Sequence, residues 1–237
     1  AIGAYDNDGL NSSSSSSRSS SGHVRIYRYS DSDWTQLDEG IDGEAADDNS
    51  GRSVSLSSDG STVAIGAYNN DGLNGINSGH VRIYEYSGNL WTQLGGDIDG
   101  ETVGDHSGFS VSLSSDGLTV AIGADYNDDN GSNAGHVRIY RYIDSSWTQL
   151  GEDIDGEATA DQSGISVSLS SDGLTVAIGA HSNDGLNSIS SSSGHVRIYT
   201  LSSAAKFTPD VVTEDTTYTI SVDNYDNAES SFTWTYN

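Results

Sequence analysis

The chain has 237 residues, with nine lysine and arginine residues against 35 aspartate and glutamate residues, and its formal net charge is -26. A surface this acidic repels the phosphate backbone of nucleic acids and the anionic surface of membranes, which excludes both as expected partners. Only 33% of the residues are hydrophobic, but they gather in short alternating runs that disordered chains lack, so we expect a folded protein.

The chain contains no cysteine, which excludes a disulfide framework without fixing the compartment. No run of residues is apolar enough and long enough to span a bilayer, so we expect no membrane insertion. The sequence begins inside a repeat, without a starting methionine or a signal peptide. We therefore expect a mature, processed or partial form of the protein.

Imperfect copies of one unit follow each other along the chain. The unit recurs every 56–59 residues, as the segment VRIY shows by beginning at Val24, Val81, Val137 and Val196. A fixed period of this length is typical of propellers and solenoids. We divide the repeat domain, 1–201, into copies at about 1–52, 53–109, 110–165 and 166–201.

Within the second copy, alternating runs predict short antiparallel strands. They are Ser53–Ser57, Thr62–Ala67, His80–Tyr86 and Trp91–Leu94, with Ile98 a little beyond. Asp59-Gly60 predicts a tight two-residue hairpin turn, and the small face of Ala64 and Gly66 admits a close neighbouring backbone.

Both faces of such a sheet carry apolar side chains, so each sheet needs a neighbour on both sides. We predict an all-β repeat protein of about four four-stranded antiparallel sheets, stacked as β-propeller-like blades, with a strand-rich C-terminal tail. The repeated tryptophans are assigned to packing between sheets because of their large apolar area; they are Trp34, Trp91 and Trp147.

The two ends of the chain break the repeat. The first copy lacks its SVSLS strand and the fourth lacks its WTQL strand, while the tail, 202–237, carries two unrelated alternating runs, Thr217–Val222 and Ser231–Tyr236. An unpaired aromatic strand is an aggregation hazard, so we expect these strands to close the ring or to pair with a neighbouring subunit. The residues predicted to make this assembly contact are Tyr218, Ile220, Val222, Phe232, Trp234 and Tyr236.

One pattern recurs through the copies: GExxxDxSGxSVSLSSDGxTVAIGA, an Asn/Asp-rich loop, GHVRIYxY and WTQLGxDIDGE. It resembles FG-GAP-type repeats, the blade repeats of integrin-α-like β-propellers in secreted and surface proteins of bacteria and algae. The resemblance covers residues 1 to about 201 and implies a propeller at an extracellular or cell-surface location. The family commonly closes rings of more blades than the copies present here, and the tail has no counterpart.

The resemblance also implies Ca²⁺ in the loop between the second and third strands, because alternate carboxylates and amides can converge on one ion that takes about six to eight oxygens. In the third copy these residues are Asp125, Asn127, Asp129 and Asn133. The shorter sets are Asp6, Asp8 and Asn11, then Asn69, Asp71 and Asn74, and finally Asn183, Asp184 and Asn187. The alternative is that these residues only form turns.

The repeated charged residues have structural interpretations. The histidines could form a metal-binding ring, but we favour hydrogen bonds between sheets; they are His23, His80, His136 and His195. The arginines two positions further on are expected to pair with repeated aspartates. The cluster 97–101 and its copy at 153–157 are interpreted as turns or arginine partners, and Asp-x-Ser-Gly as a turn.

The sequence contains no nucleophile elbow, no phosphate-binding glycine loop and no zinc-spaced histidine pair. A catalytic site needs a unique constellation, whereas the acidic residues here recur, so we predict that the protein is not an enzyme. Asn11 and Asn130 lie in N-glycosylation sequons, and the serine runs are either O-glycosylated or flexible spacers.

These observations predict an extracellular structural or adhesive repeat protein, in which a C-terminal strand closes the ring or joins subunits into a filament. The alternatives are a carbohydrate-binding propeller and a non-catalytic propeller fragment of a larger surface protein. The expected partners are other molecules of the same chain and, if the protein is a carbohydrate-binding propeller, glycans. Ca²⁺ is the expected cofactor.

Overall fold

The computed structural model describes residues 1–8, 19–184 and 192–201 in full, and the strands at 207–210, 218–223 and 229–234 by their backbone. The elements found there are all β-strands, which confirms the predicted all-β class. The described residues contain no helix of the length and apolarity needed to cross a membrane.

The strands form antiparallel sheets whose order follows the chain. The first sheet contains β1 (Ile2–Ala4), β2 (His23–Ser30) and β3 (Asp33–Asp42). The second contains β4 (Ser53–Leu56), β5 (Thr62–Ala67), β6 (His80–Ser87) and β7 (Leu90–Gln93), with β8 (Ile98–Asp99) also paired to β6. The predicted strands of the second copy are therefore confirmed.

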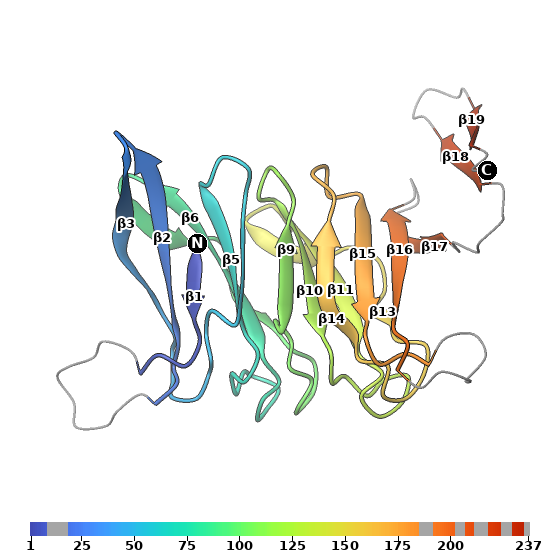
Figure 1. Cartoon of the computed structure of the whole chain (residues 1–237), viewed down its shortest axis with the longest axis horizontal. Helices are drawn as coiled ribbons and strands as arrows, with labels where there is room; N and C mark the ends of the chain where they lie inside the picture. Colours follow the sequence, from blue (N-terminus) through green and yellow to red (C-terminus); the bar gives the residue numbers. More distant parts are fainter. Residues whose placement is uncertain (9–18, 185–191, 202–206, 211–217, 224–228, 235–237) are drawn as a thin grey trace.

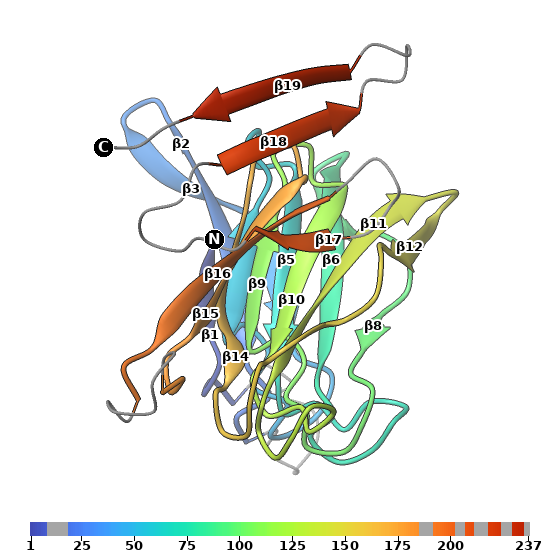
Figure 2. The ribbon, with the colours of Figure 1, turned by 90° about the vertical axis from the view of Figure 1, so that its right-hand side faces the viewer.

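The third and fourth sheets repeat this order. The third contains β9 (Ser110–Leu113), β10 (Thr119–Ala124), β11 (His136–Ile143) and β12 (Ser146–Gln149), with β13 (Ile154–Asp155) paired to β11. The fourth contains β14 (Ser163–Leu169), β15 (Thr175–Ala180), β16 (His195–Leu201) and β17 (Phe207–Asp210). Figure 1 shows the sheets following one another along the long axis of the molecule, and Figure 2 shows the same stack from its end.

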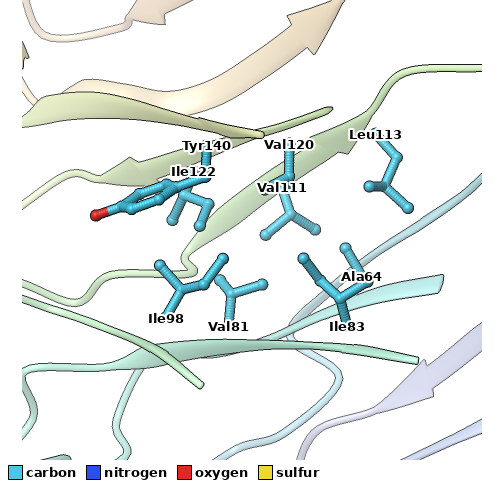
Figure 3. Close-up of a cluster of buried hydrophobic side chains, with 9 residues drawn as sticks. All are labelled: Ala64, Val81, Ile83, Ile98, Val111, Leu113, Val120, Ile122 and Tyr140. Atoms are coloured by element: carbon cyan, nitrogen blue, oxygen red, sulfur yellow. The ribbon is translucent and has the colours of Figure 1, made fainter. Parts of the chain in front are cut away.

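The core lies between neighbouring sheets and follows from strand alternation. On β6, Val81 and Ile83 face the third sheet, where they meet Ile122 and other apolar residues, whereas Tyr84 packs toward the first sheet. Figure 3 shows two apolar layers of this kind facing each other between β6 and β10. Both faces of an inner sheet are thus covered, as the sequence predicts.

Glycine permits the closest approach between sheets. A Cβ atom built on Gly66 of β5 would lie 2.0 Å from the carbonyl oxygen of Gly108, which leads into β9. The same carbonyl accepts a hydrogen bond of 2.8 Å from Ser53 Oγ. The predicted small face therefore admits the backbone of the next sheet.

The predicted two-residue turn at Asp59-Gly60 is wrong in length. Residues 57–61 separate β4 from β5, and of the two turn residues only Gly60 has a positive φ, +70°. Asp59 instead accepts hydrogen bonds from Ser57 Oγ at 2.7 Å and Ser61 N at 2.9 Å. These bonds hold the pKa of its carboxyl at about 2. The side chain of Asp59 therefore stabilises a longer loop by accepting these hydrogen bonds.

The tail differs from its prediction. A third strand, β17, completes the fourth sheet in place of the missing WTQL strand; its Pro209 fits the outer position, where no donor is needed. β18 (Tyr218–Asp223) and β19 (Glu229–Trp234) pair with each other, with Tyr218 opposite Trp234 and Ile220 opposite Phe232. Tyr236 lies outside the described residues, and a role of these strands in ring closure or assembly stays a prediction.

The two ends of the stack expose surfaces that are buried elsewhere. The outer surface of the first sheet, called here the front face, comprises Ile2, Arg25, Tyr27 and Trp34. The outer surface of the fourth sheet, called here the back face, comprises Val196 and Ile198. Trp91 and Trp147 pack against sheet interfaces as predicted, but Trp34 is 64% exposed because no sheet among the described residues covers the front face.

Candidate functional site

The polar residues that recur in every copy meet at the interfaces between sheets. Each interface brings the acidic segment that ends one sheet against the histidine and arginine that begin the third strand of the next. Arg82 of β6 donates from Nη2 to the backbone oxygen of Asp42 at 2.8 Å, and its Nη1 lies 3.3 Å from Glu44 Oε1. The predicted aspartate partners are thus replaced by a glutamate carboxylate and a backbone carbonyl.

The interface between the second and third sheets gathers the richest cluster of ligating groups. One atom each of Glu101, Asp129, His136 and Asp153 lies within 4.8 Å of the others. His136 Nδ1 is 3.8 Å from Glu101 Oε2 and 3.9 Å from Asp153 Oδ2, too far for hydrogen bonds. We call these four residues the histidine–carboxylate cluster. Such an arrangement can hold a metal ion.

His136 is 1% exposed, and its Nδ1 has no hydrogen-bond partner. Burial, aided by the nearby Arg138 charge, lowers the pKa of this histidine to about 4. The imidazole is therefore neutral near pH 7, the form in which a ring nitrogen can act as a metal ligand. Burial also raises the pKa of Glu101, against the opposing effect of Arg138.

The preceding interface contains a smaller version of the same cluster. Glu44, His80 and Asp97 bring one ligand atom each to within 4.8 Å of one another. Burial and then Arg82 lower the pKa of His80 to about 4. Between the third and fourth sheets only the pair of Glu157 and His195 is found among the described residues, with 3.5 Å between Oε2 and Nε2.

The four residues of the third copy predicted to bind Ca²⁺ have different surroundings in the structure. Asp129 joins the histidine–carboxylate cluster. Asn127 is buried, and its Nδ2 donates to Asp105 Oδ2 at 3.3 Å, while its Oδ1 accepts from Asp129 N at 3.0 Å. Asn133 occupies a turn with φ of 52°. The remaining residue, Asp125, is 2% exposed, and its Oδ1 has no hydrogen-bond partner.

In the second copy, the three predicted Ca²⁺ ligands contact three different partners. Asn69 Nδ2 donates to Asn49 Oδ1 at 2.7 Å, and Asn74 Nδ2 donates to Gly100 O at 2.7 Å. Asp71 Oδ1 accepts from Asn77 N at 3.1 Å. These bonds fit the alternative interpretation that the residues form turns, and Ca²⁺ binding here stays a prediction.

The first copy gives the same picture where the structure describes it. Asp6 Oδ1 accepts from Asn49 Nδ2 at 3.4 Å, and Asp8 Oδ1 accepts from Ser20 N at 3.2 Å. Asn11, which is also a predicted glycosylation site, lies outside the described residues, as does Asn187 of the fourth copy. Asn130 is exposed but donates from Nδ2 to Gly156 O at 2.6 Å. Ca²⁺ binding and glycosylation at these positions stay predictions.

Sequence reasoning missed Glu101 and Asp153 as candidate ligands, and it considered His136 for a metal-binding ring but favoured a hydrogen-bonding role between sheets. They lie far apart in the chain, and each belongs to a repeated motif that favoured a structural interpretation. The signal available in the sequence was Asp129. Asn70 and Asn127 form equivalent turns by accepting a hydrogen bond from the backbone two residues further on. That residue is Gly72 in the second copy but Asp129 in the third. This departure from the repeat marks the interface that has a fourth ligand.

Comparisons with known proteins support the architecture. Residues 41–84 and 98–140 match the FG-GAP repeat, so the chain carries FG-GAP repeats at these two places. No curated protein sequence matches the chain significantly.

One solved structure among those that match has a similar propeller-like fold. A candidate 6-phosphogluconolactonase of Bacteroides uniformis aligns over 80% of this chain and 48% of its own, with a TM-score of 0.55 and 13% identity. The periplasmic gluconolactonase of Pseudomonas aeruginosa aligns over 78% of this chain and 50% of its own, with a TM-score of 0.45 and 16% identity. The chain thus spans about half the length of these proteins.

The Bacteroides uniformis structure contradicts the prediction that the protein is not an enzyme. The prediction assumed that repeated acidic residues leave no unique constellation, yet a chain named for lactonase activity shares the fold. The third copy also breaks the repeat, because Asp125 and Asp129 stand where the second copy has Tyr68 and Gly72. At 13% identity the likeness concerns the fold alone.

Proposed function

We propose that the protein is an extracellular structural repeat protein that assembles head to tail, with the back face of one protein molecule stacked on the front face of the next molecule. The blades would then continue from molecule to molecule as a filament. One observation carries this proposal: the end faces expose residues whose repeat equivalents form the core.

The back face supplies the clearest comparison. Val196 is 66% exposed and Ile198 is 38% exposed, whereas Val137 and Ile139, at the same positions of the third sheet, are 0% and 1% exposed. The latter pair is buried by the fourth sheet. The back face therefore presents the surface that a further sheet covers at every inner interface.

The front face presents the complementary surface. Ile2 is 61% exposed, while its equivalent Ile65 is 1% exposed against the preceding sheet. Ile2, Tyr27 and Trp34 line a shallow apolar hollow together with Ala1. Because the two end faces differ, their contact is heterologous and extends into a filament unless the rotation closes a ring.

Strand donation is a second contact within the same proposal. The first sheet lacks the strand equivalent to β4, so the outer edge of β1 has no partner strand in the described structure. β18 and β19 form a separate two-stranded sheet, which is marginal alone. Either strand could add to β1 of the next copy.

The extracellular assignment rests on the FG-GAP repeats and on the acidic surface, which favours solubility and cation binding. Ca²⁺ at the loop of Asp125 is part of this proposal. The test of location is protease treatment of intact source cells, followed by detection of the chain with an antibody. Degradation without lysis is expected, and complete protection would contradict an exposed location.

The assembly is tested with two matched variants of the whole chain. Val196→Asp places a charge on the back face, Trp34→Ser removes the largest apolar group of the front face, and Leu73→Asp, on a loop residue 91% exposed, is the control. Wild type and control should form concentration-dependent oligomers in sedimentation velocity, and each face variant alone should remain monomeric. A mixture of the two face variants should form dimers only, because each retains one intact face.

Wild-type protein that stays monomeric at every concentration would contradict the proposal. Oligomers that persist in both face variants but vanish when residues 218–234 are deleted would assign the contact to strand donation. The mass of the native protein tests the remaining alternative, that the chain is a fragment of a longer protein. A mass well above 24.9 kDa would mean that further blades of a longer chain cover the two faces, as the length of the structural neighbours favours.

A further inference from the structure

We propose that the histidine–carboxylate cluster binds a first-row divalent transition metal of the Zn²⁺ class, which links the second and third sheets. The ligands would be His136 Nδ1, Glu101 Oε2, Asp153 Oδ2 and one carboxylate oxygen of Asp129. This site is distinct from the loop positions predicted for Ca²⁺, with Asp129 as the only shared residue.

The buried histidine is the observation that separates this cluster from an ordinary group of acidic residues. His136 is 1% exposed, and its Nδ1 lies among the carboxylates without a hydrogen-bond partner. An unpartnered buried nitrogen is unfavourable because it has lost its hydrogen bonds to water without gaining a partner in the protein. A metal ion bound by the four groups would satisfy that nitrogen and neutralise the facing carboxylates.

The distances suit a small ion. Zn²⁺ bonds of about 2.0–2.2 Å place tetrahedral donors roughly 3.3–3.6 Å apart. The distances from His136 Nδ1 are 3.8 Å to Glu101 Oε2 and 3.9 Å to Asp153 Oδ2. A contraction of roughly half an ångström would bring these two pairs to the tetrahedral spacing. All four ligand atoms already lie within 4.8 Å of one another.

Neighbouring groups already orient these ligands. Gln149 Nε2 donates to Asp153 Oδ1 at 2.6 Å, which leaves Oδ2 toward the histidine. Arg138 Nη1 lies 3.4 Å from Glu101 Oε1, which leaves Oε2 toward the same nitrogen. Partners of this kind fix the orientation of ligands in metal sites.

The donor set favours a transition metal over Ca²⁺. Ca²⁺ takes about six to eight oxygen ligands in a wide shell. This cluster instead offers one neutral imidazole and three carboxylates in a compact group, the combination that suits Zn²⁺, Mn²⁺ or Co²⁺.

The equivalent interface supplies an internal control. Glu44, His80 and Asp97 repeat three of the ligands, and Gln93 Nε2 donates to Asp97 Oδ1 at 2.6 Å as Gln149 does to Asp153. Gly72 stands in place of Asp129. The smaller cluster therefore lacks one ligand, and we expect it to bind metal more weakly.

The experiment measures Zn²⁺ binding to the metal-free whole chain by competition with a chromophoric chelator. Three proteins are compared: wild type, Asp129→Gly and Gly72→Asp. Wild type should bind one Zn²⁺ tightly, Asp129→Gly should bind it about tenfold or more weakly, and Gly72→Asp should gain a second tight site. Co²⁺ should give the visible spectrum of a tetrahedral site in wild type, with greater intensity in Gly72→Asp.

Asp129→Gly changes an exposed loop residue, and its circular dichroism spectrum should match that of wild type. His136→Gln adds a second measurement and should abolish the tight site in a protein that remains folded in the same assay. Zn²⁺ affinity unchanged by Asp129→Gly, the absence of any tight Zn²⁺ site, or tighter binding of Ca²⁺ than of Zn²⁺ would each overturn the proposal.

Discussion

The buried carboxyl of Asp125 is expected to contribute to a dependence of the protein's stability on pH. Burial raises its pKa from 3.8 to about 6, with Arg52 opposing the shift. As the pH rises from about 4 to about 6, the unfolded chain loses this proton first, so the free energy of unfolding decreases. The full shift corresponds to a loss of about 2–3 kcal/mol.

Asp125→Asn keeps the shape of the side chain but cannot ionise. In the presence of a metal chelator, it should therefore be more stable than wild type by about 2 kcal/mol at pH 7 and equally stable at pH 3.5. Urea unfolding of both proteins at the two pH values measures the difference. An equal difference at both pH values would contradict the titration, and a reversal on adding Ca²⁺ would support Ca²⁺ binding by Asp125.

A second residue-scale prediction concerns the glycines of the TVAIGA strands. A Cβ atom on Gly123 would lie 2.0 Å from the backbone oxygen of Gly164 in the next sheet, whereas on Gly179 it would meet only the Ser166 side chain, at 2.3 Å from Oγ. Backbone is hard to displace, so Gly123→Ala should destabilise the protein by about 2–3 kcal/mol. Gly179→Ala should stay within about 1 kcal/mol of wild type because a serine can rotate.

The paired variants are compared by thermal and urea unfolding. Both variants replace glycine by alanine in the same strand motif, so the difference in β-strand propensity between the two residue types affects both variants equally. Equal destabilisation by both substitutions would mean that the contact with the next sheet is not what the glycine permits.

At the scale of elements, serine hydroxyls join one sheet to the next. Ser112 Oγ on β9 accepts a hydrogen bond of 2.9 Å from Leu169 N on β14, and Ser55 does the same for Leu113 N. Ser112→Ala leaves a backbone donor without its acceptor and should cost about 1–3 kcal/mol. Ser168→Ala, at the equivalent exposed position of the last sheet, should be neutral, and equal unfolding free energies for both variants would contradict this role.

The strands were predictable because their alternation is strict. Thr62–Ala67 matches β5 at both ends, and the other copies repeat each strand two or three times more. β17 was missed because Phe207–Asp210 has neither alternation nor a repeat equivalent, and only its pairing with β16 makes it a strand.

The candidate site was harder to predict for a related reason. Glu101 and His136 are brought together by stacking two sheets, and no spacing within one copy encodes that contact. The repeat itself obscured the site, because a residue seen in every copy was interpreted as structural. The departure from the repeat at Asp129 was visible in the sequence but was assigned to a Ca²⁺ ion in the loop.

At the scale of the whole molecule, charge and apolar surface act against each other in assembly. Each protein molecule carries a formal net charge of -26, so two molecules repel one another over distances longer than the contact itself. The back face contributes apolar residues, whose burial salt does not weaken. Repulsion between exposed charges is screened beyond about 8–10 Å at 0.10–0.15 M salt.

Head-to-tail association should therefore strengthen as salt is raised. Sedimentation velocity at about 0.01, 0.15 and 0.5 M NaCl, where the screening length falls from roughly 30 Å to roughly 4 Å, should show progressively larger oligomers of the wild type. Val196→Asp should remain monomeric throughout, because screening removes the general repulsion without restoring the apolar contact. The opposite trend, with oligomers that dissociate as salt rises, would indicate that Arg25 of the front face meets a carboxylate of the neighbouring copy and that ion pairing, rather than apolar burial, holds the copies together.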